Sequence, residues 1–194
     1  MHHVITTAVA GNWLFGGTAE YEARLALFAA AVRDDRLALN QFCLMGNHEH
    51  LLVSVEEGRL GAAMQWINRS YAVLFNARRG RRGRLYDGPY ESRIVKDEAY
   101  SLWVVTYIAL NPEAIAGVTA ETHRWSSYAS LLGLREPLPF IDDTPIVDWF
   151  GGGDAGRARI AEAVDAARGW KLQRVRGDAL LSQPRPGRGS STHA

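Results

Sequence analysis

The sequence predicts an α+β domain built on an antiparallel four-stranded sheet. Short β-branched or apolar runs alternate with longer segments whose apolar residues recur at helical spacing. The elements follow one another as strand, helix, strand, strand, helix, strand, with one more helix after them. The two consecutive strands are joined by Gly46-Asn47, a turn pair that favours a tight hairpin and therefore antiparallel pairing.

The first strand is expected from Val4 to Val9, a short β-branched run. Gly16-Gly17 then interrupts the chain, and Thr18 is suited to cap a helix. The apolar face of this helix carries residues at helical spacing: Tyr21, Leu25, Phe28 and Val32. The second and third strands, from Ala38 to Met45 and from His48 to Ser54, flank the hairpin turn.

A second helix is expected after Gly58, with apolar spacing that continues to about Asn76. Tyr90 to Lys96 forms the fourth strand, and Asp97 caps a third helix that runs to Asn111-Pro112. This βαββαβ order matches the ferredoxin-like (RRM-like) arrangement, in which two helices pack on one face of an antiparallel sheet. The third helix is then free to cover the opposite face.

The chain is expected to divide into three parts. Residues 1–133 contain the elements above. Residues 134–169 form a helical appendage, in which Arg157 to Arg168 is a small amphipathic helix. Residues 170–194 are expected to be a flexible basic tail, because the chain from Gln183 is rich in Pro, Arg, Gly and Ser.

Composition limits the class of protein. Hydrophobic residues make up 47% and charged residues 22% of the chain, which is ordinary for a soluble globular protein. The net charge of +1 does not by itself indicate a nucleic-acid binder. Cys43 is the single cysteine, which excludes an intramolecular disulfide and fits a reducing cytoplasm. The sequence shows no signal-peptide pattern and no apolar run long enough to span a membrane, so we expect a cytoplasmic protein with no membrane partner.

Two histidines on the third predicted strand form the first candidate site. Because strand side chains alternate between faces, His48 and His50 point to one side of the sheet and Glu49 to the other. Two imidazoles on a rigid strand can hold one metal ion at little ordering cost, although a pair alone is equally compatible with ordinary polar residues beside a turn. The HExxH zinc-peptidase motif is excluded, because Leu52 stands where its second histidine is required.

The third predicted helix carries a stripe of residues that should face the sheet: Tyr100, Trp103, Val104, Tyr107, Ile108 and Asn111. Alone, a buried tyrosine is usually core and an asparagine before proline often ends a helix. However, Tyr107 and Asn111 are four residues apart and project toward the same spot. If that spot is the face of His48 and His50, Asn111 supplies a third metal ligand and Tyr107 a nucleophile. A divalent metal on a phosphodiester oxygen would assist attack by a phenol, whose ordinary pKa is about 10.

An arginine-rich loop between the second helix and the fourth strand is a candidate phosphate clamp. It contains Arg78, Arg79, Arg81, Arg82 and Arg84, with no acidic residue among them. Such charge runs are commonly only solvated, but the glycines in and after this loop favour a binding role in which guanidiniums hold a nucleic-acid backbone. Arg69 and Arg93 complete the candidate DNA contacts. A nucleophile, a metal triad and a phosphate clamp together indicate phosphodiester transfer through a phosphotyrosine.

Four stretches resemble the REP-associated tyrosine transposases, which belong to the single-tyrosine HUH transposases of the small insertion-sequence type. They are CLMGNHEHLLVSV, INRSYAVLFNARRGRRGRLYDGPYESRIV, YIALNPEAIAGV and RWSSYASLLG, and the resemblance covers roughly Val4 to Gly133. It implies a ferredoxin-like HUH domain with His48, His50 and Asn111 as ligands of Mg²⁺ or Mn²⁺ and Tyr107 as nucleophile.

The same resemblance implies a function. The enzyme would cleave and rejoin single-stranded DNA that carries imperfect palindromic hairpins, through a 5′-phosphotyrosine intermediate. We expect a monomer or a homodimer, in which Tyr107 acts with the metal ligands of its own chain or of a second copy.

Three positions depart from the family pattern: Glu49 replaces a hydrophobic residue, Gly46 a proline, and Ala10-Gly11-Asn12 an Arg-Gly-Asn. A buried carboxylate is costly, so Glu49 should pair with an arginine such as Arg69 or reach solvent at the strand start. Glu49 also motivates an alternative function, a domesticated, non-catalytic binder of structured single-stranded DNA or RNA. The aromatic residues available to stack bases in such a binder are Tyr86, Tyr90, Trp125 and Tyr128.

Overall fold

The computed structural model describes residues 1–175, and of residues 169–175 only the backbone. Its four strands are β1 (His2–Thr7), β2 (Ala38–Met45), β3 (His48–Ser54) and β4 (Glu91–Ile94). They form one sheet in the order β2-β3-β1-β4, with every neighbouring pair antiparallel. The predicted α+β class and the βαββαβ order of elements are therefore confirmed.

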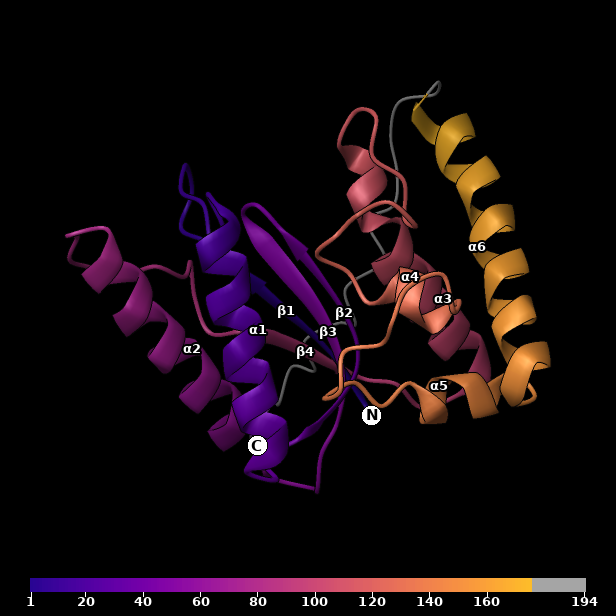
Figure 1. Ribbon diagram of the computed structural model, residues 1–194, viewed down its shortest axis with the longest axis horizontal. Helices are drawn as coiled ribbons and strands as arrows, with labels where there is room; N and C mark the ends of the chain where they lie inside the picture. The colour runs from indigo at the N-terminus through magenta and orange to yellow at the C-terminus, as the bar shows by residue number, and fades with distance from the viewer. Residues whose placement is uncertain (176–194) are drawn as a thin grey trace, which may run out of the picture.

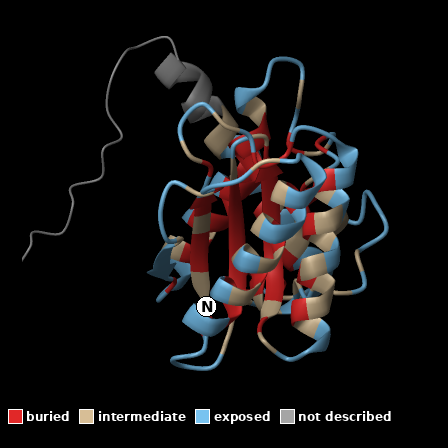
Figure 2. Cartoon of the chain, turned by 90° about the vertical axis from the view of Figure 1, so that its left-hand side faces the viewer, coloured by how far each residue is buried: buried red, intermediate tan, exposed pale blue. Residues whose placement is uncertain are grey.

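Helices α1 (Thr18–Arg33) and α2 (Leu60–Arg78) cover one face of the sheet (Figure 1). The strand residues that face them belong to one buried core. Most of the sheet behind these helices is buried (Figure 2), whereas every residue of β4 is exposed. The helix α1 begins at Thr18 itself, so Gly17 and not Thr18 occupies the N-cap position, without a side-chain cap. Glu20 in the first turn instead accepts a hydrogen bond from the Gly16 amide.

The opposite face is covered by α3 (Glu98–Leu110), which continues as the 3₁₀ turn η1 (Asn111–Ala114). The side chain of Asp97 caps α3 as predicted, accepting a 2.8 Å hydrogen bond from the Tyr100 amide. Proline after Asn111 removes one backbone donor, which is consistent with the change from α to 3₁₀ geometry at this point.

Three further helices build a layer outside α3: α4 (Tyr128–Leu131), α5 (Thr144–Trp149) and α6 (Gly153–Val175) (Figure 1). They share a second buried core with α3 and with the strand residues beneath it. None of the described helices is long and apolar enough to cross a membrane.

One cation joins three segments of this outer layer. Arg168 of α6 contacts Glu113 in η1 at 2.8 Å, Glu121 in the following loop at 2.8 Å, and Asp165 one turn earlier at 2.7 Å. The helix α6 continues to Val175, so residues 170–175 are helical where the sequence predicts a flexible tail. The rest of that predicted tail, residues 176–194, lies outside the described residues.

Candidate active site

The strand β3 places its two histidines on the face that α3 covers. His48 is half-buried and His50 is buried, and their ring centroids lie 5.0 Å apart. Both positions follow from the register of the hairpin, in which Met45 pairs with His48 and Cys43 with His50. The expectation that the two imidazoles share one face is confirmed.

The end of α3 brings the other two predicted site residues to the same place. The Oδ1 atom of Asn111 lies 2.9 Å from Nε2 of His48. The ring of Tyr107 stands almost perpendicular to that of His50, with centroids 5.1 Å apart. The structure therefore gathers all four residues, which are far apart in sequence, into one cluster.

A third histidine, His3 on β1, also belongs to the cluster. Its Nε2 atom lies 3.2 Å from Nδ1 of His50, and its ring contacts that of Tyr107 at a centroid distance of 6.1 Å. Sequence reasoning missed His3 because it starts the first strand at Val4, whereas β1 starts at His2 and pairs His3 with Leu52. The signal that could have found it is alternation, since residues 3, 5 and 7 share one face of a strand.

Burial keeps the inner imidazoles neutral. Loss of solvent, with smaller contributions from His48 and His3, lowers the pKa of His50 to about 2. Burial first and the charge of Arg93 second lower the pKa of His3 to about 4. A neutral imidazole has a free nitrogen lone pair at pH 7, which is the form that binds metals.

The donor atoms of the cluster fit a divalent metal. Among the described residues, Nε2 of His50 is buried and has no hydrogen-bond partner, although buried polar atoms are normally satisfied. His48 Nε2 and Asn111 Oδ1 complete a set of two nitrogens and one oxygen. In the described part of the chain no three His, Cys, Asp or Glu side chains gather for a metal, so an ion here would need the amide of Asn111. Nitrogen donors suit Mn²⁺ or Zn²⁺ better than Mg²⁺.

Three aromatic rings of α3 form a stack that ends at the cluster. Tyr100 stacks on Trp103 at a centroid distance of 5.7 Å, and Trp103 stacks on Tyr107 at 5.1 Å. Trp103 is 38% and Tyr107 40% exposed, so the predicted stripe does not face the sheet as a whole. Val104 and Ile108 do face the sheet, because α3 packs over β2 and β3. Every residue of β4, by contrast, is exposed. Through the contact of Tyr107 with His3, which pairs with Arg93, the aromatic stack thus ends beside the exposed strand β4.

Glu49 points away from the cluster and is fully paired. Its carboxylate accepts hydrogen bonds from Nη2 and Nε of Arg24 on α1, the latter at 2.9 Å, and both side chains are at most 1% exposed. The expectation that Glu49 pairs with an arginine is confirmed, but the example given, Arg69, is wrong: Arg69 is exposed on α2, and the partner is Arg24 of α1. Arg24 also donates to the Ile67 carbonyl and to Asn68. The charge of Glu49 is therefore compensated on the side of the sheet opposite to the histidines.

The candidate DNA-binding arginines fall into two groups. Arg93 is exposed on β4, directly opposite His3 and therefore on the face of the histidines. Arg69 is exposed in the middle of α2, and the others lie at the end of α2 or in the loop after it: Arg78, Arg79, Arg81, Arg82 and Arg84. Of these, Arg79 is paired with Glu20 at 2.6 Å. Arg78 donates to the Ala19 carbonyl and Arg84 to the Asp87 carbonyl.

The aromatic residues assigned to base stacking in the alternative function are largely occupied. Tyr128 is 1% exposed in the core beneath α3, so its assignment is wrong: α4 turns its ring inward. Trp125 stacks on Tyr21 at 4.4 Å and is also contacted by the guanidinium of Arg124. Tyr86 is partly buried and donates to the Asn68 carbonyl.

Comparison with protein-family models and with curated proteins gave no match. Among solved structures, the chain is similar to a REP-associated tyrosine transposase bound to a REP hairpin, with a TM-score of 0.55 and 17% sequence identity. The match covers 74% of this chain and 86% of that chain. At this identity the likeness is one of fold. The chain thus has the fold of a REP-associated tyrosine transposase, in agreement with the resemblance of its sequence.

Proposed function

We propose that the protein cleaves and rejoins single-stranded DNA that carries a hairpin, with Tyr107 as the nucleophile and a divalent metal as cofactor. The observation that carries the proposal is the contact of Tyr107 with His50, beside the Asn111–His48 pair and near the exposed strand β4. A hairpin is the bound molecule in the structural neighbour, which supports hairpin DNA as the substrate.

The chemistry follows from the groups present. The phenolic oxygen of Tyr107 forms a bond to the phosphorus, the bond from phosphorus to the 3′ oxygen breaks, and that oxygen takes a proton to become a free 3′ hydroxyl. The 5′ end of the strand stays on tyrosine, and attack by a 3′ hydroxyl on this phosphotyrosine rejoins a strand. A metal ion held by His48, His50 and Asn111 would neutralise charge on the phosphate oxygens.

Neighbouring residues have supporting roles. Trp103 stacks on Tyr107 and limits the orientations of its ring. His3 lies within hydrogen-bond distance of His50 and fixes which ring nitrogen of His50 is left for the metal. Arg93, exposed beside His3 on the same face, is placed to hold the backbone of the strand.

The test is incubation of the full chain with labelled single-stranded hairpin DNA and Mn²⁺, followed by denaturing electrophoresis. The wild type should give a covalent protein–DNA band, and Tyr107→Phe should abolish it while native-gel binding survives. Tyr100→Phe is the matched control, because it removes a hydroxyl from the same aromatic stack without touching His50. An intact adduct in Tyr107→Phe would refute the assignment of the nucleophile.

The alternative, a non-catalytic binder of structured DNA or RNA, was motivated by Glu49 inside the histidine pair. The Arg24–Glu49 pair removes that motivation, since the carboxylate is compensated and faces away from the histidines. The same experiment separates the two functions: native-gel retention without metal and without an adduct would favour the binder.

A further inference from the structure

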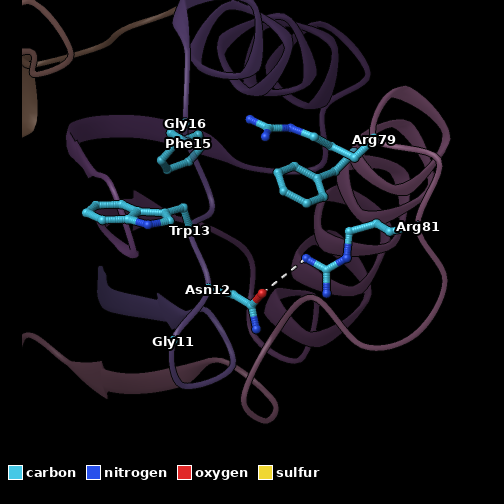
Figure 3. Close-up of a pocket in the computed structure, with 8 residues that line it drawn as sticks. Gly11, Asn12, Trp13, Phe15, Gly16, Arg79 and Arg81 are labelled. Atoms are coloured by element: carbon cyan, nitrogen blue, oxygen red, sulfur yellow. Dashed lines mark hydrogen bonds between the residues drawn. The ribbon is translucent and has the colours of Figure 1, made fainter.

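A cavity of about 520 Å³ lies between the loop that links β1 to α1 and the end of α2 (Figure 3). It is lined by Gly11, Asn12, Trp13, Phe15, Gly16, Phe75, Arg79 and Arg81. We call it the Trp13 pocket. None of these residues belongs to the histidine cluster, and the catalytic proposal does not use them.

Trp13 is held in place although it is 63% exposed. The amides of the next two residues, Leu14 and Phe15, both donate to the carbonyl of Gly46, at 2.7 and 2.9 Å. The hydroxyl of Tyr71 donates to the Leu14 carbonyl at 2.6 Å. These bonds fix the chain directly after Trp13, and the Asn12 amide, which donates to the Val9 carbonyl at 2.9 Å, fixes it directly before. A ligand that stacks on Trp13 would therefore meet a preformed surface at low entropic cost.

Gly46 is what allows the indole to lie where it does. A Cβ atom at residue 46 would come within 2.2 Å of Cζ3 of Trp13, closer than any real contact. Any other residue at this turn, proline included, would displace the ring. Gly46 therefore leaves room for the Cε3–Cζ3 edge of the indole, which abuts the hairpin turn, while 63% of the tryptophan stays exposed.

The rim of the Trp13 pocket supplies one available cation and one amide. The Nη1 atom of Arg81 is 3.5 Å from Oδ1 of Asn12, a weak contact (Figure 3). The guanidinium of Arg81 also lies over the ring of Phe75, 5.6 Å from its centroid. Arg79 points into the same pocket but is neutralised by Glu20. An open aromatic plane, a guanidinium and an amide are the groups that recognise a base, a phosphate and a base edge of one unpaired nucleotide.

The pocket is joined to the histidine cluster by the hairpin turn. The residue after Gly46 is Asn47, whose Oδ1 lies 2.8 Å from Nδ1 of His48. The Ala8 amide donates to the Asn47 carbonyl at 2.9 Å and fixes the turn to the end of β1. Gly46, which the edge of the indole abuts, and His48, the first candidate metal ligand, are therefore two residues apart on this turn.

We propose that the Trp13 pocket binds one unpaired nucleotide of the single-stranded DNA whose phosphodiester is cut at Tyr107. The base stacks on Trp13, the phosphate pairs with Arg81, and Asn12 contacts the base edge. This inference rests on the proposed function, because it takes the same strand as ligand. It adds base recognition to an arginine loop that alone would hold only the backbone.

The test compares the binding of the full chain to two DNAs in a fluorescence-anisotropy titration: a hairpin with single-stranded flanks and the same hairpin without them. Trp13→Ala should weaken binding of the flanked hairpin about ten-fold, from loss of one stacked base, and leave the unflanked hairpin nearly unchanged. Gly46→Ala should act like Trp13→Ala, because it displaces the indole without removing any charge. Trp13→Phe should restore most of the affinity. Leu134→Ala, which truncates an exposed apolar residue elsewhere, is the matched control.

A positional readout separates stacking from a structural role. With 2-aminopurine placed in turn at each unpaired position, one position should be quenched on binding, and the quenching should disappear in Trp13→Ala. Equal affinities for Trp13→Ala and Leu134→Ala, or quenching that does not depend on Trp13, would overturn the proposal. Tighter, Trp13-dependent binding of the matching RNA would overturn the assignment to DNA. The wild-type covalent adduct tests the proposed function separately: Trp13-dependent binding without an adduct would leave the pocket standing and refute the cleavage.

Discussion

The two faces of β3 differ in how their buried polar side chains are paired, although Glu49 and His50 are neighbours in sequence. On the face covered by α1 and α2, Glu49 is buried with Arg24 and its carboxylate is bound on both oxygens. On the face covered by α3, His50 is buried beside His3 and keeps a nitrogen without a protein partner in the described residues. The first face is closed, and the second is open in that it carries neutral imidazoles, keeps a nitrogen available and lies next to the exposed strand β4. The difference shows that an acidic residue between two candidate metal ligands can have a role in the core on the other side of the sheet.

The largest expected effect is on the closed face. Glu49→Leu should destabilise the fold by about 3–5 kcal/mol, because it leaves the guanidinium of Arg24 buried without its anion. Urea unfolding of the purified variant measures this change. The double variant Arg24→Leu, Glu49→Leu is the control and should recover much of the loss, since it removes both charges. A single variant as stable as the wild type would show that Arg24 does not depend on Glu49.

On the open face, the expected effect is a gain of stability when a metal ion binds. Mn²⁺ at about 100 times its dissociation constant should stabilise the wild type by about 2.7 kcal/mol, and His50→Ala should remove this gain. Thermal unfolding with and without Mn²⁺ gives the comparison. An unchanged Mn²⁺ response in His50→Ala would place the metal elsewhere.

A substitution of His3 tests whether metal affinity depends on residues other than the predicted ligands. His3→Ala should weaken Mn²⁺ binding about 10- to 100-fold without abolishing it, as for other residues that orient a ligand. Isothermal titration calorimetry measures the affinity. His2→Ala is the matched control, because His2 lies on the other face of β1, paired with Val53 and Ile94. Equal affinities for the two variants would remove His3 from the site.

The smallest expected effect concerns the aromatic stack at the border of the open face. Trp103→Ala should cost about 1–2 kcal/mol of stability through loss of two ring contacts. The adduct should still form, but more slowly, because Tyr107 loses the ring that limits its orientation. Time courses of adduct formation measure this rate. Ile115→Ala is the control, because Ile115 is a comparably exposed apolar residue. Faster formation of the adduct in Trp103→Ala would mean that the stack holds Tyr107 in an orientation that does not favour attack.

The parts of the fold that were predictable depend on local rules. The hairpin around Gly46-Asn47 has the bounds that the sequence predicts, because a two-residue turn fixes the register of both strands. The common projection of Tyr107 and Asn111 follows from helical periodicity. The placement of these residues against His48 and His50 then needed only the expectation that α3 covers the second face.

The missed features depend on packing between distant segments. Arg24 lies on a helix whose sequence gives no sign of a buried cation, and its partner is 25 residues away. His3 joins the site only because β1 is paired on both sides, a fact about the whole sheet. Trp13 forms a pocket wall because Gly46, in another loop, leaves room for its ring.

The salt bridges of Arg168 bear on how small this protein can be made. Glu113, which Arg168 holds, is two residues beyond Asn111, and the outer helices share a core with the helix that carries Tyr107. A fragment cut after residue 133 would keep every candidate ligand and the candidate nucleophile, yet would lose the anchor for the turn that aims the amide of Asn111 at His48. A shortened version of this chain should therefore retain α6.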